Sequence, residues 1–176
     1  MARTTVEGYL DILDETLLTF RLPAYQARLR VRERRLPKLY WTDPGLTRAV
    51  KRSFGEVGLE ERGALFEGLV AQYLRAAADY YRTGYEVFYW SSGAGRGSEV
   101  DFLVKRDERF VAVEVKSGDN FSESWCRGLR AISELPRLCR RLVVTPTLGP
   151  LVTHDGIEVR SFLDFAGLVR SGSLFD

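Results

Sequence analysis

Two runs of alternating apolar and polar residues, at positions 99–104 and 111–116, constrain the fold of this chain most strongly. Such alternation is typical of β-strands, in which successive side chains point to opposite faces of the sheet. The residues between the runs, 106–109, are polar and few enough to close a hairpin. The sequence therefore predicts two paired strands, each with an apolar face.

The opposite face of this predicted pair gathers charged side chains. Pairing of the strands would bring Asp101, Glu114 and Lys116 together on one face. Two carboxylates a few ångströms apart repel each other unless a proton or a cation lies between them. Mg²⁺ suits such a pair, because it takes one or two carboxylates together with waters and phosphate. With a lysine beside the metal, the site has the groups needed to hydrolyse a phosphodiester. In the first strand, one predicted face has Val100, Phe102 and Val104, and the opposite face has Glu99, Asp101 and Leu103. In the second strand, one predicted face has Val111, Val113 and Val115, and the opposite face has Ala112, Glu114 and Lys116.

A helix is predicted over residues 59–80, where apolar side chains recur at helical spacing. Glu67 lies at the edge of the apolar arc, about 20° beyond Leu74. From there its carboxylate can face a cleft at the sheet edge, although a solvated flank is the commoner place for such a residue. The arc consists of Leu65, Phe66, Leu69, Val70, Tyr73, Leu74 and Ala77.

The remaining elements complete a mixed α/β sheet with helices on its faces. A capping box at Thr4 and Glu7 predicts a first helix that ends near Phe20. Asp43 before Pro44 is expected to cap a turn or helix. The other expected elements are an exposed strand at 25–35, a short strand running into a turn at 37–45, strands at 85–90, 141–145 and 156–162, and helices at 122–135 and 163–170.

Charge and cysteine content restrict the function only loosely. Lys and Arg number 26 against 24 Asp and Glu, so the net charge is only +2. Basic residues cluster at 21–38 and 127–141, and each cluster is either a phosphate-binding stripe or a solvated face. Cys126 and Cys139 lack metal-type spacing and suit a reducing cytoplasm. No apolar stretch approaches the 18 residues of a membrane span, and the polar N-terminus is not a signal peptide.

Other motifs give little support to other chemistries. The glycine-rich segment 91–97 lacks the GxxxxGK[ST] pattern, and we interpret it as a hairpin connection. His154 is the only histidine and stands in a predicted turn, so a catalytic triad or a His-rich zinc site has little basis. One alternative to the metal site also stays open: the same charges can be solvent-facing residues of a half-exposed sheet, with Lys116 bridging strands.

The motifs Glu99-Val100-Asp101 and Glu114-Val115-Lys116, preceded by Glu67, resemble the PD-(D/E)XK phosphodiesterase superfamily, whose fold is that of restriction endonucleases. More narrowly, the chain resembles the C-terminal region of prokaryotic AAA-type ATPases, through Tyr9-Leu10-Asp11-Ile12-Leu13-Asp14, residues 37–46, Leu65-Phe66-Glu67 and the two strand motifs. Val100 stands where the superfamily has proline. The resemblance implies a winged-helix remnant at 1–36, a nuclease-like domain at 37–176, and an ATPase domain in a longer parent protein.

The resemblance also implies roles for individual residues. Asp101, Glu114 and the Val115 carbonyl would bind Mg²⁺ or Mn²⁺, and Glu67 would bind a second cation or a metal-bound water. Lys116 would orient the attacking water and stabilise charge on the phosphate. The expected function is metal-dependent cleavage of DNA. A non-catalytic module that binds DNA or a partner is the alternative, and a defence effector or a homodimer is compatible with either.

Overall fold

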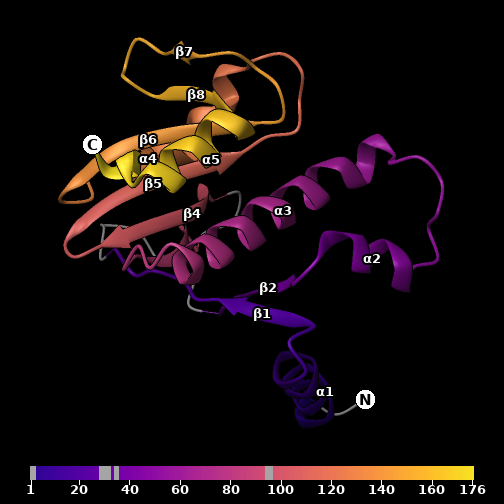
Figure 1. The fold of residues 1–176 in the computed structure, drawn as a ribbon. Coiled ribbons are helices and arrows are strands. Elements are labelled where there is room, and N and C mark those ends of the chain that lie inside the picture. The colour runs from indigo at the N-terminus through magenta and orange to yellow at the C-terminus, as the bar shows by residue number, and fades with distance from the viewer. Residues whose placement is uncertain (1–2, 28–32, 34–35, 94–96) are drawn as a thin grey trace.

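A computed structural model describes residues 3–27, 33, 36–93 and 97–176 of the chain. Its centre is a six-stranded mixed sheet in the order β3-β4-β5-β6-β8-β7 (Figure 1). Helices α3 (Leu59–Tyr80) and α5 (Phe162–Ser171) pack on one face of the sheet, and α4 (Arg127–Ala131) packs on the other. The predicted mixed α/β class, with helices flanking the sheet, is confirmed.

The predicted hairpin is formed by β4 and β5. These strands pair antiparallel, with Phe102 opposite Val113 and Arg106 opposite Arg109. Strand β6 then pairs parallel to β5, and β8 parallel to β6. The strands of the sheet are β3 (Glu86–Ser91), β4 (Glu99–Arg106), β5 (Arg109–Val115), β6 (Leu138–Thr145), β7 (Leu151–Val152) and β8 (Glu158–Ser161).

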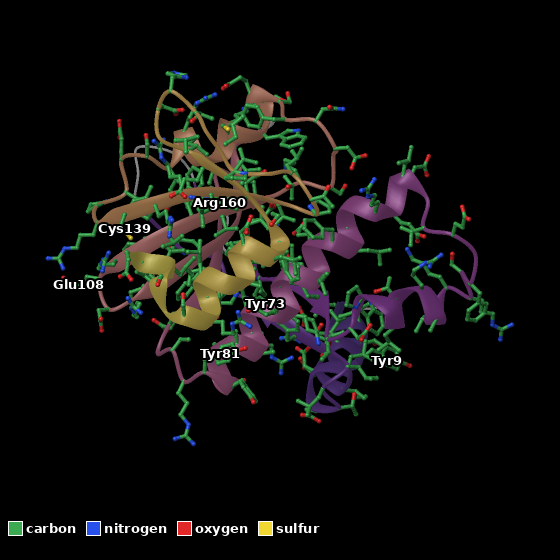
Figure 2. The ribbon with its side chains drawn as sticks, turned by 45° about the horizontal axis from the view of Figure 1, so that its top comes forward. Tyr9, Tyr73, Tyr81, Glu108, Cys139 and Arg160 are labelled. Carbon is green, nitrogen blue, oxygen red and sulfur yellow. The ribbon has the colours of Figure 1, made fainter. Side chains whose placement is uncertain are left out.

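The predicted central helix is α3 (Leu59–Tyr80), and its bounds match the prediction. Val70 and Leu74 are fully buried against the sheet. The Tyr73 hydroxyl donates to the Ala166 carbonyl at 2.9 Å and ties α3 to α5 (Phe162–Ser171), the last helix (Figure 2).

The N-terminal part forms a second, smaller unit of structure. It contains α1 (Arg3–Glu15), β1 (Thr19–Leu22), β2 (Lys38–Trp41) and α2 (Pro44–Val50). Strands β1 and β2 make a two-stranded antiparallel ribbon. The Asp43 carboxylate accepts from the Gly45 amide at 2.6 Å and caps α2, as predicted. Leu22 reaches the main core, so the ribbon packs on the rest of the chain.

Two predicted helices are shorter than expected. The first ends at Glu15, because Leu17 turns the chain with a φ of 59°, and Phe20 lies in β1. Thr4 lies inside this helix, whereas the capping box placed it before the first turn. The predicted helix at 122–135 is a 3-10 turn, η1 (Glu123–Cys126), followed by α4 (Arg127–Ala131). Turns at 132–137 bury Ile132 and Leu135, so apolar spacing there does not require a helix.

Candidate functional site

Asp101 and Glu114 lie side by side on neighbouring strands. The β4–β5 register pairs Phe102 with Val113, and the next step along both strands brings Asp101 opposite Glu114. Both carboxylates are buried, at 7% and 8% exposure. The Val115 amide donates to Asp101 Oδ2 at 2.8 Å, which fixes the first carboxylate against the second strand.

A β-bulge in β4 lies at Asp101. Phe88 pairs with Leu103 and Trp90 with Val100, so two residues of β4 oppose the single residue between them on β3. The bulge breaks the alternation of faces. Phe102 packs in the core beneath α3, whereas Val100 packs with Leu103 beneath α4. The predicted shared face of Val100 and Phe102 is therefore wrong, while the predicted faces of the β5 valines are confirmed. Bulges re-aim side chains and are frequent beside active sites.

Glu114 has one oxygen engaged and one free. Lys116 Nζ donates to Glu114 Oε1 at 2.6 Å. Within the described part of the chain, the buried Oε2 has no hydrogen-bond partner. Helix α4 closes this side of the site: a Cβ on Gly128 would lie 1.7 Å from the Glu99 carbonyl oxygen and 3.4 Å from Glu114 Oε2. Only glycine allows so close an approach.

The surroundings make both carboxylates hard to ionise. Burial raises the pKa of Asp101, and repulsion from Glu67 raises it further. These two effects outweigh the lowering of the pKa by Lys38, Lys116 and the Val115 amide. Burial also raises the pKa of Glu114, and the charge of Asp101 adds to it, outweighing Lys116. A bound cation would relieve both effects.

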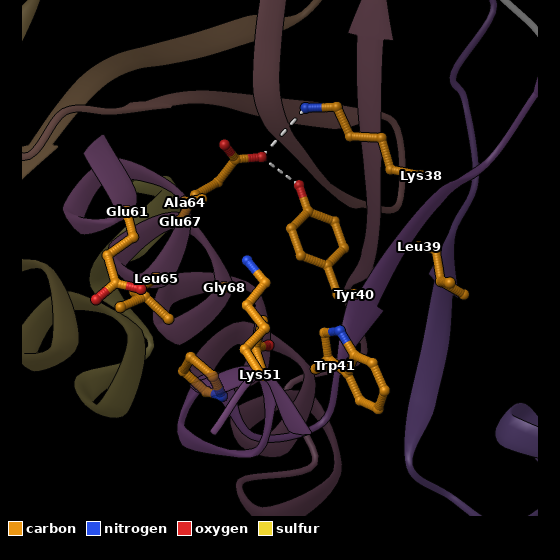
Figure 3. A pocket seen from close by; sticks show the side chains of 12 residues that line it. Lys38, Leu39, Tyr40, Trp41, Lys51, Glu61, Ala64, Leu65, Glu67 and Gly68 are labelled. Atoms are coloured by element: carbon orange, nitrogen blue, oxygen red, sulfur yellow. Dashed lines mark hydrogen bonds and ion pairs between the residues drawn. The ribbon is translucent and has the colours of Figure 1, made fainter. Parts of the chain in front are cut away.

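Sequence reasoning missed two residues of the site, Lys38 and Tyr40, which β2 contributes. Lys38 Nζ lies 2.5 Å from Glu99 Oε1, 3.2 Å from Glu67 Oε1 and 3.7 Å from Asp101 Oδ1. The Tyr40 hydroxyl donates to Glu67 Oε1, as Figure 3 shows. Burial alone would lower the pKa of Lys38, but attraction to Glu67 and Asp101 outweighs it and raises the pKa. The only sequence signal for Lys38 and Tyr40 is their i, i+2 spacing in β2. This spacing does not show which residues their side chains contact.

The carboxylates fit a hard divalent cation. Mg²⁺ prefers oxygen ligands and keeps several waters, so the Asp101 and Glu114 carboxylates suffice as its anchors. The unpartnered Glu114 Oε2 is an available ligand atom. In the described residues no group of three or more His, Cys, Asp or Glu is arranged as a ready-made metal cluster. Lys38 engages Glu67 and Glu99, two of the nearby carboxylates.

Most of the basic residues at 127–141 are engaged in ion pairs rather than aligned as a free stripe. Arg130 pairs with Asp155 at 3.0 Å, and Arg140 pairs with Glu158 at 2.6 Å. This agrees with a solvated, ion-paired face. The other basic cluster includes Arg28, Arg30, Arg32, Arg34 and Arg35, which lie outside the described residues, as do Ala94, Gly95 and Arg96 of the glycine-rich segment.

Two further predictions concern the single histidine and membrane-spanning helices. His154 lies in a turn, as expected. Among the described helices, none is long and apolar enough to cross a bilayer.

Two regions of the chain match known protein families. Residues 1–57 match the family described as Domain of unknown function (DUF8612), and residues 62–164 match Domain of unknown function (DUF4143). Lys38 and Tyr40 fall in the first region, and the other site residues fall in the second. The site therefore combines side chains from both.

Similar proteins occur in mycobacteria. Uncharacterized proteins of Mycobacterium tuberculosis and Mycobacterium bovis are each 30% identical over 149 residues, which are 83% of this chain and 32% of the relative. The chain thus spans about a third of the length of these relatives. Because the match covers more than half of its residues, the chain belongs to the family described as Domain of unknown function (DUF4143).

Proposed function

We propose that this chain is a metal-dependent nuclease-like domain of the PD-(D/E)XK type, which hydrolyses phosphodiester bonds of DNA. The observation that carries the proposal is the buried pair of Asp101 and Glu114, with Lys116 bonded to the second carboxylate. Burying two carboxylates together costs free energy unless a cation offsets it. Such a costly arrangement is typical of functional sites.

The topology supports the same proposal. From residue 59 onward the chain runs through helix α3, the antiparallel strands β3, β4 and β5, helix α4 and the parallel strand β6. This is the order of helix, three strands, helix and strand that the sequence pattern predicts after residue 59, and the proposal needs it to bring the two strand motifs beside Glu67. The β4 bulge also fits, because it sets the first carboxylate apart from the regular alternation of the strand.

The residues have distinct roles in the proposed reaction. Asp101, Glu114 and the Val115 carbonyl would hold Mg²⁺ or Mn²⁺, which when bound polarises the phosphate and acidifies a water. Lys116 stabilises negative charge that develops on the phosphate and orients the attacking water. Glu67 would receive a second cation or a metal-bound water, and the Tyr40 hydroxyl holds its carboxylate in place.

The mycobacterial relatives are about three times as long as the matched segment. We propose that the parent protein carries an AAA-type ATPase domain, which would deliver DNA to this site. Residues 1–36 would then derive from its winged helix, although β1 of this segment pairs with β2 of the nuclease-like part.

A second candidate is a non-catalytic module of the same fold that binds DNA or a partner. The position of Lys38 favours it, because an ammonium group within 4 Å of three carboxylates neutralises part of their charge without a metal. The two candidates differ in whether DNA is cleaved when a divalent cation is supplied.

The test is cleavage of single-stranded, duplex and branched DNA with Mg²⁺ or Mn²⁺, comparing the wild type with Glu114→Gln and Glu108→Gln. Glu108 lies exposed in the β4–β5 turn, far along the hairpin from Glu114, and serves as the matched control. The nuclease proposal expects cleavage by the wild type and Glu108→Gln alone. Metal binding without cleavage of any DNA would favour the binding module.

A further inference from the structure

A pocket of about 360 Å³ borders the site beside Glu67, between β2, α2 and α3 (Figure 3). This volume lies within the range of small-ligand pockets. Leu39, Trp41 and Leu65 supply apolar and aromatic lining. The polar and charged lining comes from Lys38, Thr47, Lys51, Glu61 and Glu67. The Tyr40 hydroxyl links the pocket to Glu67.

Lys51 gives the pocket an available positive charge. Figure 3 shows its side chain extending along the pocket beside Tyr40. Among the described residues, no ion pair or side-chain hydrogen bond engages its ammonium group. The neighbouring cations differ: Lys38 pairs with Glu67 and Glu99, and Arg48 pairs with Glu61 at 3.1 Å. An anionic ligand would satisfy Lys51 without breaking an existing pair.

Trp41 gives the pocket an available aromatic face. It is half-buried, and in the described part of the chain it stacks on no other ring, whereas Tyr40 stacks with Phe20. Its indole N–H has no protein acceptor among these residues. An aromatic ligand with polar edges and an attached anion would use the indole, the Thr47 hydroxyl and the Lys51 ammonium together.

We infer that this pocket takes one unpaired base of a DNA strand, stacked on Trp41 with a flanking phosphate on Lys51. The inference rests on the proposed nuclease function, which brings the same strand to the carboxylates. A base within a duplex is stacked on both faces and cannot enter. The preferred substrate would therefore have a single-stranded, frayed or branched segment next to the scissile phosphate.

Binding is measured by fluorescence anisotropy with Ca²⁺ at fixed salt, using a labelled eight-nucleotide single strand and a duplex of the same sequence. Trp41→Leu is expected to weaken single-strand binding about 5- to 150-fold, the equivalent of the ~1–3 kcal/mol of one base–aromatic stack. Trp41→Phe should retain much of the affinity. Trp125→Leu is the matched control, because Trp125 packs on the α4 side of the sheet.

Lys51→Gln should also weaken binding and reduce its salt dependence, whereas Arg52→Gln, next to it but outside the pocket, should do neither. A strand with one abasic position, moved along the oligonucleotide, completes the test. At one position, the loss of affinity caused by the missing base and the loss caused by Trp41→Leu should not add, because both changes remove the same base–indole stack.

Equal affinity of the wild type and Trp41→Leu for the single strand, or a preference for intact duplex, would overturn the inference. This outcome leaves the nuclease proposal standing if DNA is still cleaved. Conversely, pocket-dependent binding without metal binding at Asp101 would overturn the nuclease proposal and leave the pocket as the site of a DNA-binding module.

Discussion

Lys38 Nζ lies 3.7 Å from Asp101 Oδ1, so a positive charge from β2 already stands beside the carboxylate expected to bind metal. The same nitrogen contacts Glu67 and Glu99. Lys38 therefore holds the ribbon of β1 and β2 on the carboxylates and competes with any added cation for their charge.

Lys38→Met should bind Mn²⁺ roughly 10-fold more tightly than the wild type, or more. One unit charge about 4 Å away is worth about 1–4 kcal/mol between the dielectric constants of water and of a protein surface. Calorimetric titration measures the affinity. Lys105→Met is the control, because Lys105 forms an equivalent pair with Glu86 at 3.2 Å. Weaker Mn²⁺ binding by Lys38→Met would show that Lys38 supports the metal site rather than competing with it.

The stability of the metal-free protein should fall as pH rises through the raised pKa values of Asp101 and Glu114. Both groups bind protons more tightly in the folded state than at their ordinary pKa of about 4, so the folded state holds more protons above that pH. Their destabilisation begins near pH 4 and is complete above the raised values.

Urea unfolding of the wild type and Glu114→Gln at several pH values isolates this effect, because the contributions of Asp155 and Glu158, whose pKa values are lowered, are common to both. The difference in slope should approach about 1.4 kcal/mol per pH unit for one proton. At high pH, Mg²⁺ should remove most of the difference in the free energy of unfolding between the two proteins. Below the raised pKa values, Mg²⁺ binding should also release protons from the carboxylates. If the free energy of unfolding changed with pH in the same way in the two proteins, the raised pKa of Glu114 would be contradicted.

Lys116→Ala should lower the rate of DNA cleavage by roughly 100-fold or more, the scale of losing one preorganised electrostatic group. Its affinity for metal should stay equal or increase, because a positive charge beside Glu114 is removed. DNA binding measured with Ca²⁺ should change little. Cleavage and calorimetry together separate the two roles, with Lys105→Ala as the control. Unchanged cleavage would remove Lys116 from the mechanism.

Gly128→Ala should destabilise the protein by about 1–3 kcal/mol, the usual cost of overpacking. The added methyl group would collide with the Glu99 carbonyl oxygen and push α4 from the carboxylates. Gly167→Ala in α5 is the control: nothing lies within 4 Å of its added Cβ, so helix propensity should make it neutral or stabilising. Thermal unfolding compares the two, and equal effects would argue against the close contact at Gly128.

Local pattern was enough to predict α3 and the β4–β5 hairpin. The apolar arc of α3 recurs at helical spacing from Leu65 to Ala77, and the two strands alternate with a short polar connection between them. These features also brought Asp101, Glu114 and Lys116 together, because strand pairing follows from the hairpin alone.

The missed features depend on contacts distant in sequence. The bulge that separates Val100 from Phe102 is set by pairing with β3. Lys38 and Tyr40 enter the site because the β1–β2 ribbon packs on α3, and no periodicity in residues 38–41 reveals that partner. Residues 122–135 bury their apolar side chains through turns, which helical spacing cannot distinguish from a helix.

The central claim is that Asp101 and Glu114 bind a divalent cation, and Mn²⁺ titration calorimetry tests it most directly. The proteins to compare are the wild type, Asp101→Asn and Asp107→Asn. Asp107 is exposed in the hairpin turn with a φ of 55°, which asparagine also tolerates. We expect Asp107→Asn to bind like the wild type and Asp101→Asn to bind at least about 10-fold more weakly. Equal affinity in all three proteins, or no binding by the wild type, would contradict the account.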